Sequence, residues 1–120
     1  GTPLGFNVDI RRADATDQAR DAQLAIDALA PIARLLEPID ATMLTPGGSG
    51  ADIGPLVEAT GVLGLGLRND MSLYWHIHHT RADTFDKIDP AALRQNVATV
   101  AVAAWMLAEM DERPWEGPTP

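Results

Sequence analysis

A short apolar run, Val62 to Leu67, constrains the fold more than any other stretch of the sequence. Its aliphatic side chains alternate with Gly64 and Gly66. A brief apolar run between turn signals is typical of a buried strand, and glycine within it lets other groups pack closely against the backbone. We therefore expect a strand here that needs cover on both of its faces.

Strand and helix patterns surround this run. Alternating apolar and polar residues predict a strand at Gly5–Ile10, and a further short strand is expected at Ala41–Thr45. Apolar residues at three- and four-residue steps, or local start and stop signals, predict helices near residues 17–37, 52–59 and 90–110. The order predicts an α/β layered sheet, and about three short strands with apolar edges are typical of part of a larger sheet.

Local signals predict where the helices begin and bend. Asp89 followed by Pro90 is a strong helix start, and Asp52 is expected to cap the helix after it. Pro31 lies inside the first helical pattern, which predicts a kink or a break near Ala28. The last helix is apolar around most of its surface and is expected to pack deeply.

Composition excludes several classes of function. The chain has 120 residues, enough for one domain, and a net charge of −8 with 9 scattered basic residues, which argues against nucleic-acid binding. It has no cysteine, and no apolar run reaches the roughly 18 residues of a membrane span. The start at Gly1 without Met suggests a processed piece of a longer protein. Residues 113–120 form a Pro-rich tail in which Trp115 could dock.

All three histidines of the chain, His76, His78 and His79, fall within four positions. On an extended segment, His76 and His78 would point to one side and His79 to the other, so this segment alone is not expected to form a three-histidine metal site. The residues themselves leave two interpretations open. One is a group of surface histidines in a polar loop, and the other is part of a metal site.

Two stretches of the sequence resemble a known enzyme family. The stretch His79–Pro90, which reads His-Thr-Arg-Ala-Asp-Thr-Phe-Asp-Lys-Ile-Asp-Pro, resembles the end of the catalytic domain in the di-zinc exopeptidases of metallopeptidase family twenty-eight, in the carboxypeptidase Q-like branch. Gly47–Leu56 and Gly61–Leu65 are similar to that family's glycine-rich loop and the strand after it. The resemblance covers residues 1–112 and implies the C-terminal portion of a peptidase domain with a three-layer αβα sheet.

The resemblance implies roles for residues of the histidine segment. His79 matches the last zinc ligand, and His78 lies where related enzymes have a Tyr that helps to hold the oxyanion, a role that an imidazole N–H can fill. Asp83 is a chemically reasonable brace for the ligand. Relatives commonly have Phe-Asp-Tyr where this chain has Trp75-His76-Ile77, so His76 receives no role.

The resemblance also implies substrate-binding residues and a missing part of the site. Ser49 and Gly50 match the loop that borders the substrate cleft. The family needs two zinc ions and a Glu that acts as general base on a metal-bound water. No His precedes His76 and no Glu-Glu pair occurs, so the chain supplies one zinc ligand and is expected to be inactive alone.

Three alternative functions are compatible with these sequence features. The first is a fragment of a di-zinc metallo-exopeptidase, an aminopeptidase or carboxypeptidase-like enzyme that acts on a peptide substrate; its parent is expected to be extracytoplasmic, either periplasmic or secreted. The second is a non-catalytic peptidase-like module for binding or dimerisation. The third is an independent α/β binding module that forms a homodimer through the exposed edge of its sheet at Val62–Leu67.

Overall fold

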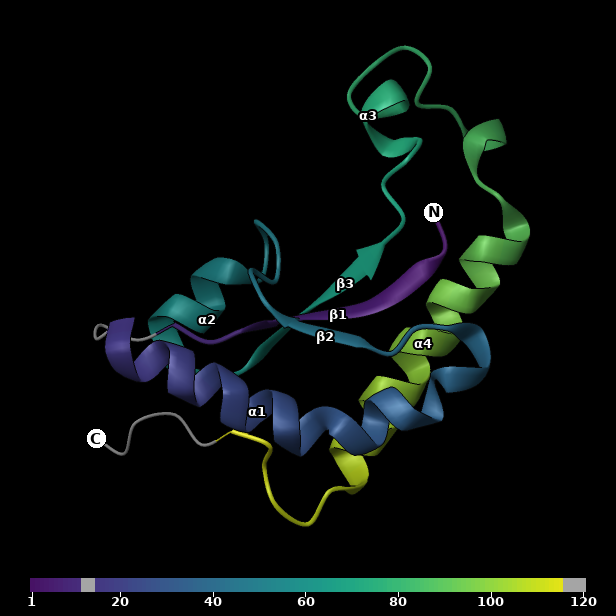
Figure 1. Ribbon diagram of the computed structural model, residues 1–120. Coiled ribbons are helices and arrows are strands. Elements are labelled where there is room, and N and C mark those ends of the chain that lie inside the picture. Colours follow the sequence, from purple (N-terminus) through teal and green to yellow (C-terminus); the bar gives the residue numbers. More distant parts are fainter. Residues whose placement is uncertain (12–14, 116–120) are drawn as a thin grey trace.

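The computed structural model describes residues 1–11 and 15–115, and these residues form a small three-stranded sheet with helices around it (Figure 1). The elements follow in the order β1 (Pro3–Asp9), α1 (Ala15–Leu35), a 3-10 turn (Glu37–Ile39), β2 (Met43–Pro46), α2 (Gly54–Thr60), β3 (Gly64–Asn69), α3 (Tyr74–Ile77), a second 3-10 turn (Phe85–Lys87) and α4 (Pro90–Glu109). The predicted α/β class is confirmed.

The sheet has the strand order β2-β1-β3. β1 pairs in parallel with β2 and antiparallel with β3, so that Asn7 lies between Thr45 on one side and Gly66 on the other. A parallel pair needs a long crossover, and α1 supplies it between β1 and β2. β2 and β3 are both edge strands within the described part of the chain.

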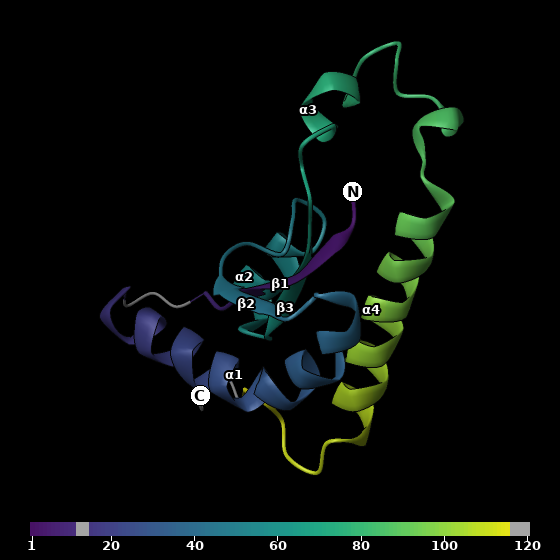
Figure 2. The same cartoon turned by 45° about the vertical axis from the view of Figure 1, so that its right-hand side comes forward.

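One face of the sheet carries the apolar core. The alternation that predicted β1 places Phe6 and Val8 on this face, with Ile10 just beyond the strand, and all three are at most 4% exposed. The buried stripe of α1, two residues between α1 and β2, and one position of α4 cover them, through Ala25, Leu29, Ile32, Leu36, Ala41 and Ala103. Figures 1 and 2 show α1 and α4 crossing beside the sheet.

The opposite face of the sheet is polar. Asn7 and Asp9 alternate with the core residues of β1, and the Arg68 guanidinium donates to Asn7 Oδ1 at 3.2 Å and to Thr45 Oγ1 at 3.0 Å. α2 and the loop before it lie on this side, where Val57 packs against β3 at Gly64. Helices are therefore present on both sides of the sheet, as expected, with α1 and α4 on the apolar face and the short α2 on the polar face.

Two expectations for the strands and the first helix are corrected. β3 begins at Gly64 rather than Val62 and is only partly covered, and Val62 is 48% exposed. α1 runs without a break through Ala28 and Pro31, so the predicted break is wrong, while a kink stays a prediction. Proline costs a backbone hydrogen bond, but Leu29 and Ile32 are buried on either side of it, and this packing holds the turn in helical geometry.

Two expectations for the other helices are also corrected. Ile53, not Asp52, is the N-cap residue of α2, and no side chain caps that end. α4 does not pack deeply, because only Ala92, Thr99 and Ala103 of this helix are buried, and large apolar side chains such as Val97 and Trp105 are exposed. The Asp89 cap is confirmed, since its carboxylate accepts from the backbone N–H groups of the next two non-proline residues at 3.0 and 3.2 Å.

α4 is long and apolar enough to cross a membrane when judged by length and composition alone, and 17% of the tested window is buried. The expectation that the chain contains no possible span is therefore not confirmed. The core helix of a soluble protein passes the same test, so this finding is weak evidence for a membrane.

The first residues of the C-terminal segment return to the fold. Trp115 donates from Nε1 to the carbonyl oxygen of Gly61 at 3.2 Å and packs against the edge of the apolar core. The predicted docking of Trp115 is confirmed. The rest of the predicted tail, residues 116–120, lies outside the described residues.

Candidate functional site

The histidine segment, which was expected to be a loop, begins with one helical turn. α3 places Tyr74 and His78 four positions apart on one side of the turn, and their rings stack with centroids 4.2 Å apart. The Tyr74 hydroxyl also forms a 2.9 Å hydrogen bond with His78 Nε2. In the tautomer in which Tyr74 donates this bond, His78 Nδ1 carries the proton and is the ring donor that remains.

His79 follows in an unusual backbone conformation. Its φ of 57° lies in the left-handed region, which costs a non-glycine residue about 1–3 kcal/mol unless its surroundings enforce it. The centroid of its ring lies 3.7 Å from that of His78, and the residue is exposed. Such conformations concentrate at functional sites, so the outlier supports a role for His79 that goes beyond folding.

The loop after His79 is held by local hydrogen bonds. Thr80 Oγ1 donates to the carbonyl of Ile77 at 2.7 Å and accepts from the N–H of Ala82 at 3.1 Å. Hydrogen bonds from Lys87 and then Thr84 lower the pKa of Asp86 to about 2, so its carboxylate stays charged. These contacts give the polar loop a defined path towards α4.

The donors of this chain do not make a metal site by themselves. Within residues 1–11 and 15–115, no three His, Cys, Asp or Glu side chains are grouped in a way that could hold a metal ion. Over the same residues, no hydrogen bond links the Asp83 carboxylate to His79, and the role of Asp83 as a partner of the ligand or a brace of the loop stays unassigned. A single exposed imidazole falls short of the three protein ligands that a catalytic zinc needs.

The glycine-rich loop is attached to the polar face of β1. The N–H of Gly47 donates to the carbonyl of Val8 at 3.1 Å, and Asn7 Nδ2 donates to the carbonyl of Gly48 at 3.3 Å. Ser49 then donates twice to Asp9 Oδ2, from its backbone N–H at 2.8 Å and from its hydroxyl at 2.7 Å.

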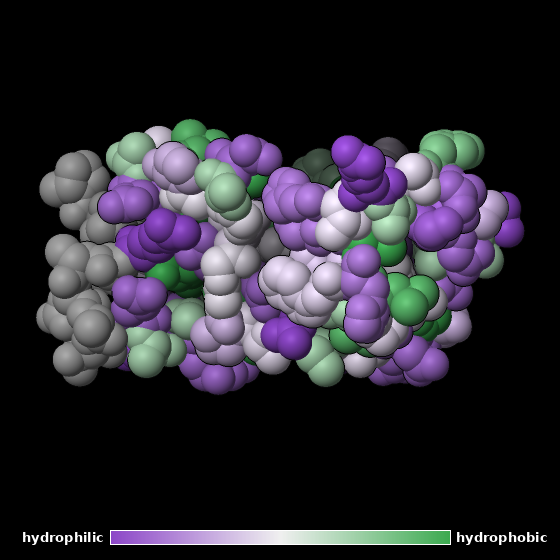
Figure 3. Space-filling model, turned by 90° about the horizontal axis from the view of Figure 1, so that it is seen from above, coloured by the Kyte–Doolittle hydropathy of each residue, from purple (hydrophilic) through white to green (hydrophobic). Residues whose placement is uncertain are grey.

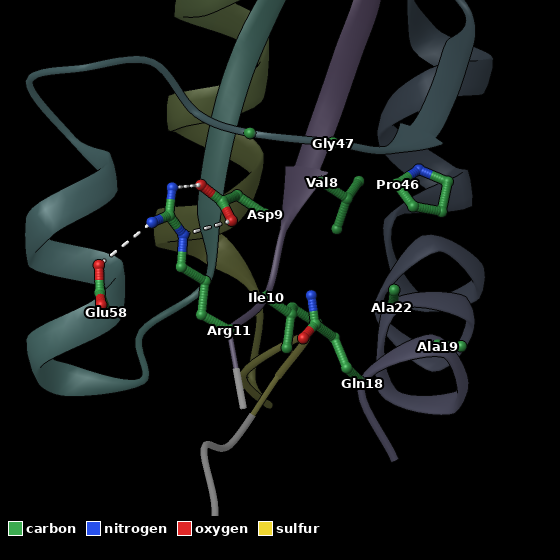
Figure 4. A pocket seen from close by; sticks show the side chains of 11 residues that line it. Val8, Asp9, Ile10, Arg11, Gln18, Ala19, Ala22, Pro46, Gly47 and Glu58 are labelled. Carbon is green, nitrogen blue, oxygen red and sulfur yellow. Dashed lines mark hydrogen bonds and ion pairs between the residues drawn. The ribbon is translucent and has the colours of Figure 1, made fainter. Parts of the chain in front are cut away.

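Asp9 is the buried charge of this region. Burial alone would raise the pKa of the Asp9 carboxyl, but the hydrogen bonds from Arg11 and Ser49, together with the positive charge of Arg11, lower it below its ordinary value. Arg11 also forms an ion pair with Glu58 of α2 at 3.3 Å. Figure 4 shows Arg11 between the two carboxylates.

A pocket of about 920 Å³ opens beside this cluster. Asp9, Arg11 and Glu58 lie on one side of it, and Gln18 with two alanines of α1 lies on the other (Figure 4). This cluster was not predicted from the sequence. The alternation of β1 places Asp9 on the face opposite Val8, but the sequence does not show that Ser49, 40 positions later, would reach it.

The structure does not bring the two predicted parts of the site together. Ser49 lies beside Gly64 at the start of β3, whereas the histidine segment follows Asn69 at the end of that strand. Ser49 also approaches Gly66, and from Gly66 to Asn69 the strand spans about 10 Å. Gly50 belongs to the loop, and His78 and His79 belong to the distant segment.

The sequence is similar to carboxypeptidase Q of several vertebrates. Mouse carboxypeptidase Q is 37% identical over 81 residues, which are 68% of this chain and 17% of the mouse protein. The human protein is 35% identical over 78 residues, or 65% of this chain and 16% of its own length. Carboxypeptidase Q of Xenopus laevis is 35% identical over 81 residues, or 68% and 17%. No family model and no solved structure matches the chain significantly.

The α/β sheet and this similarity define the class of the protein. The chain resembles part of a carboxypeptidase. In particular, it is carboxypeptidase Q-like, as the histidine and glycine-rich motifs predicted. The matched part spans about a sixth of the length of these relatives.

Proposed function

We propose that residues 1–112 are the C-terminal portion of the catalytic domain of a di-zinc metallo-exopeptidase, with residues 113–120 as its tail. The parent would hydrolyse a terminal peptide bond of a short peptide, as an aminopeptidase or a carboxypeptidase-like enzyme. The observation that carries this proposal is the similarity to carboxypeptidase Q across two thirds of the chain. The exposed His79 with its left-handed backbone supports it.

The chain would contribute part of the site. His79 would supply one imidazole ligand, and His78 would offer its Nδ1–H to the oxyanion while Tyr74 holds its other ring nitrogen. Ser49 and Gly50 would border the substrate cleft. The remaining ligands and the general base would come from residues outside this chain, so the chain alone would not hydrolyse peptides.

The test uses the longer protein that contains this chain. We expect two zinc ions per protein and hydrolysis of dipeptides, and we expect His79→Ala to lower both the bound zinc and the rate. His76→Ala is the matched control, because His76 is an exposed histidine three positions away with no assigned role. A parent that binds no zinc and cleaves no peptide would refute the proposal.

The incomplete cover of the fold supports a larger parent domain. Both outer strands have free edges in the described region, and the outer face of α4 exposes Val97 at 61% and Trp105 at 69%. A soluble domain rarely leaves so much apolar surface uncovered. In the proposed parent, further strands and helices of the peptidase domain would cover these surfaces. The resemblance supports an extracytoplasmic parent, which fractionation of the source cells would test.

The same surfaces favour a second candidate function, a non-catalytic module for binding or dimerisation. Two copies could pair through the edge of β3 or through the apolar face of α4. Sedimentation velocity of the purified chain distinguishes the two candidates when it is combined with zinc and activity measurements on the parent. A zinc-free, inactive parent together with a dimeric chain would favour this alternative over the peptidase.

A further inference from the structure

The buried carboxylate of Asp9 accepts hydrogen bonds from two partners. Arg11 donates from Nε to Oδ1 at 3.2 Å and from Nη2 to Oδ2 at 3.4 Å, and both the backbone N–H and the hydroxyl of Ser49 donate to Oδ2, at 2.8 and 2.7 Å. Asp9 is only 5% exposed. Hydrogen bonds to a buried charge are stronger than those between neutral groups, so this contact fixes Ser49 more firmly than the rest of its loop.

The neighbouring glycines confirm that the loop is seated closely. A Cβ on Gly66 would lie 2.7 Å from the carbonyl oxygen of Gly48, and a Cβ on Gly64 would lie 2.8 Å from the Ser49 hydroxyl. Gly50 differs from them. It has a φ of 100°, and a Cβ built on it would meet no described atom within 4 Å. The loop is therefore attached up to Ser49 and open at Gly50.

These contacts limit the ability of Ser49 to donate a hydrogen bond to a substrate. The backbone N–H and the hydroxyl proton of Ser49 both point to Asp9. A substrate that needed a donor from Ser49 would have to displace a charge-assisted hydrogen bond, which is unfavourable. Gly48 and Gly50 both have room beside the backbone, but the carbonyl of Gly48 accepts from Asn7 Nδ2, so Gly50 is the residue with room for a peptide beyond the attached part of the loop.

We propose that Asp9 and Ser49 form a positioning pair, which holds the glycine-rich loop so that Gly50, and not Ser49, meets the peptide substrate. This inference rests on the proposed function, because the peptidase provides the cleft that the loop borders. Asp9 acts through Ser49 and touches no substrate. Arg11 helps to keep Asp9 charged through its hydrogen bonds and its positive charge.

The first experiment measures amide hydrogen exchange of Ser49 in the chain as it stands. We expect Asp9→Asn to accelerate exchange at Ser49 by at least about tenfold, the loss of a charge-assisted bond. Asp70→Asn is the matched control, since Asp70 accepts the same two kinds of bond from Ser72, at 2.9 and 3.1 Å, in an exposed turn. Unchanged exchange at Ser49 in Asp9→Asn would overturn the positioning pair.

The second experiment measures steady-state kinetics of the longer protein. We expect Asp9→Asn and Ser49→Ala each to raise KM about tenfold with kcat within about twofold, because a loosened loop binds substrate less well. The double variant should raise KM no more than the more severe single variant does, because both substitutions weaken the same Asp9–Ser49 contact. Effects on KM that multiply, or a loss of kcat in Ser49→Ala alone, would place Ser49 against the substrate and overturn the proposal.

The two experiments fail in different ways. An unsubstituted parent without peptidase activity would remove the proposed function and, with it, the assignment of Gly50 to a substrate. The exchange measurement would still decide whether Asp9 holds Ser49. An active parent with unaffected Ser49 exchange in Asp9→Asn would instead leave the peptidase standing and remove the pair.

Discussion

The carboxylate of Asp9 is almost fully buried and still charged, because Arg11 and Ser49 together outweigh the cost of its burial. The folded-state pKa of Asp9 therefore lies below the ordinary value of 3.8. A lowered pKa adds stability above the unfolded-state pKa, and that stability disappears as the pH falls through the folded-state pKa. The attachment of the loop should thus hold through mildly acidic conditions and weaken only below about pH 4.

We predict that Asp9→Asn lowers the free energy of unfolding at pH 7 by about 1.5–3 kcal/mol, the usual cost of losing hydrogen bonds to a buried charge. The difference from the unsubstituted chain should shrink as the pH falls below about 4, where Asp9 itself becomes protonated. Urea unfolding from pH 7 to pH 3 measures this. A difference that stays constant over the whole range would contradict a charged Asp9.

A glycine can be required by the close approach of another backbone. We predict that Gly66→Ala destabilises the chain by about 1–3 kcal/mol, because its Cβ would lie 2.7 Å from the carbonyl oxygen of Gly48 and 3.0 Å from the Cα of Ser49. Gly48→Ala is the control, since a Cβ there meets no described atom, and its effect should stay within about 0.5 kcal/mol. Thermal unfolding of both variants provides the comparison, and equal effects would show that the loop does not rest on β3.

At the scale of elements, two aspartates with the same apparent role behave differently. We predict that Asp89→Ala costs about 1 kcal/mol, because its carboxylate caps two N–H groups of α4, while Asp52→Ala changes the stability by less than about 0.5 kcal/mol. Chemical denaturation of the two variants measures the difference. A larger loss in Asp52→Ala than in Asp89→Ala would mean that the caps are assigned to the wrong helix.

The elements that the sequence predicted well are those with local causes. The alternation of β1 and the cap at Asp89 depend on residues within one or two turns, and the structure confirms both. The start of α2 was missed at Asp52, because the backbone N–H of Gly54 instead bonds to the carbonyl of Gly50 inside the preceding loop. Similarly, the sequence could not reveal the helical turn at Tyr74, whose contact with His78 appears only once the turn has formed.

The candidate site was predictable in part, and for a different reason. The motifs around His79 indicated the family, and the similarity to carboxypeptidase Q confirms it. The Asp9 cluster was not predictable, because Asp9, Ser49 and Glu58 are distant in sequence and meet only when β1, the glycine-rich loop and α2 assemble. Side chains joined by topology leave no periodic signal in a single sequence.

At the scale of the molecule, apolar side chains are well buried on one side of the fold and exposed on the other. The core between the sheet and α1 is well buried, whereas α3 and the segments beside it expose Leu73, Trp75 and Phe85 at 71–87%, and the outer side of α4 exposes Val97 and Trp105. Figure 3, which looks down on the molecule from above, shows apolar side chains scattered among polar ones at the end where α3 lies. An apolar surface of this extent is typical of a region that meets a partner.

A lysine introduced on the outer face of α4 should affect the stability of the isolated chain and of its proposed parent differently. Val97 is 61% exposed and lines an apolar groove with Leu67 and Val100. In the isolated chain, Val97→Lys places its ammonium group in water, so we expect the free energy of unfolding to change by no more than about 0.5 kcal/mol. In the parent, where other parts of the domain would cover this face, the same substitution would bury a charge and cost several kcal/mol.

Ala98→Lys, on the next exposed position of the helix, is the control and should be neutral in both proteins. Melting temperatures of the four variant proteins measure the contrast. If the parent tolerates Val97→Lys as well as the chain does, the groove is open to solvent there too, and the apolar face of α4 is not an internal surface of a peptidase domain.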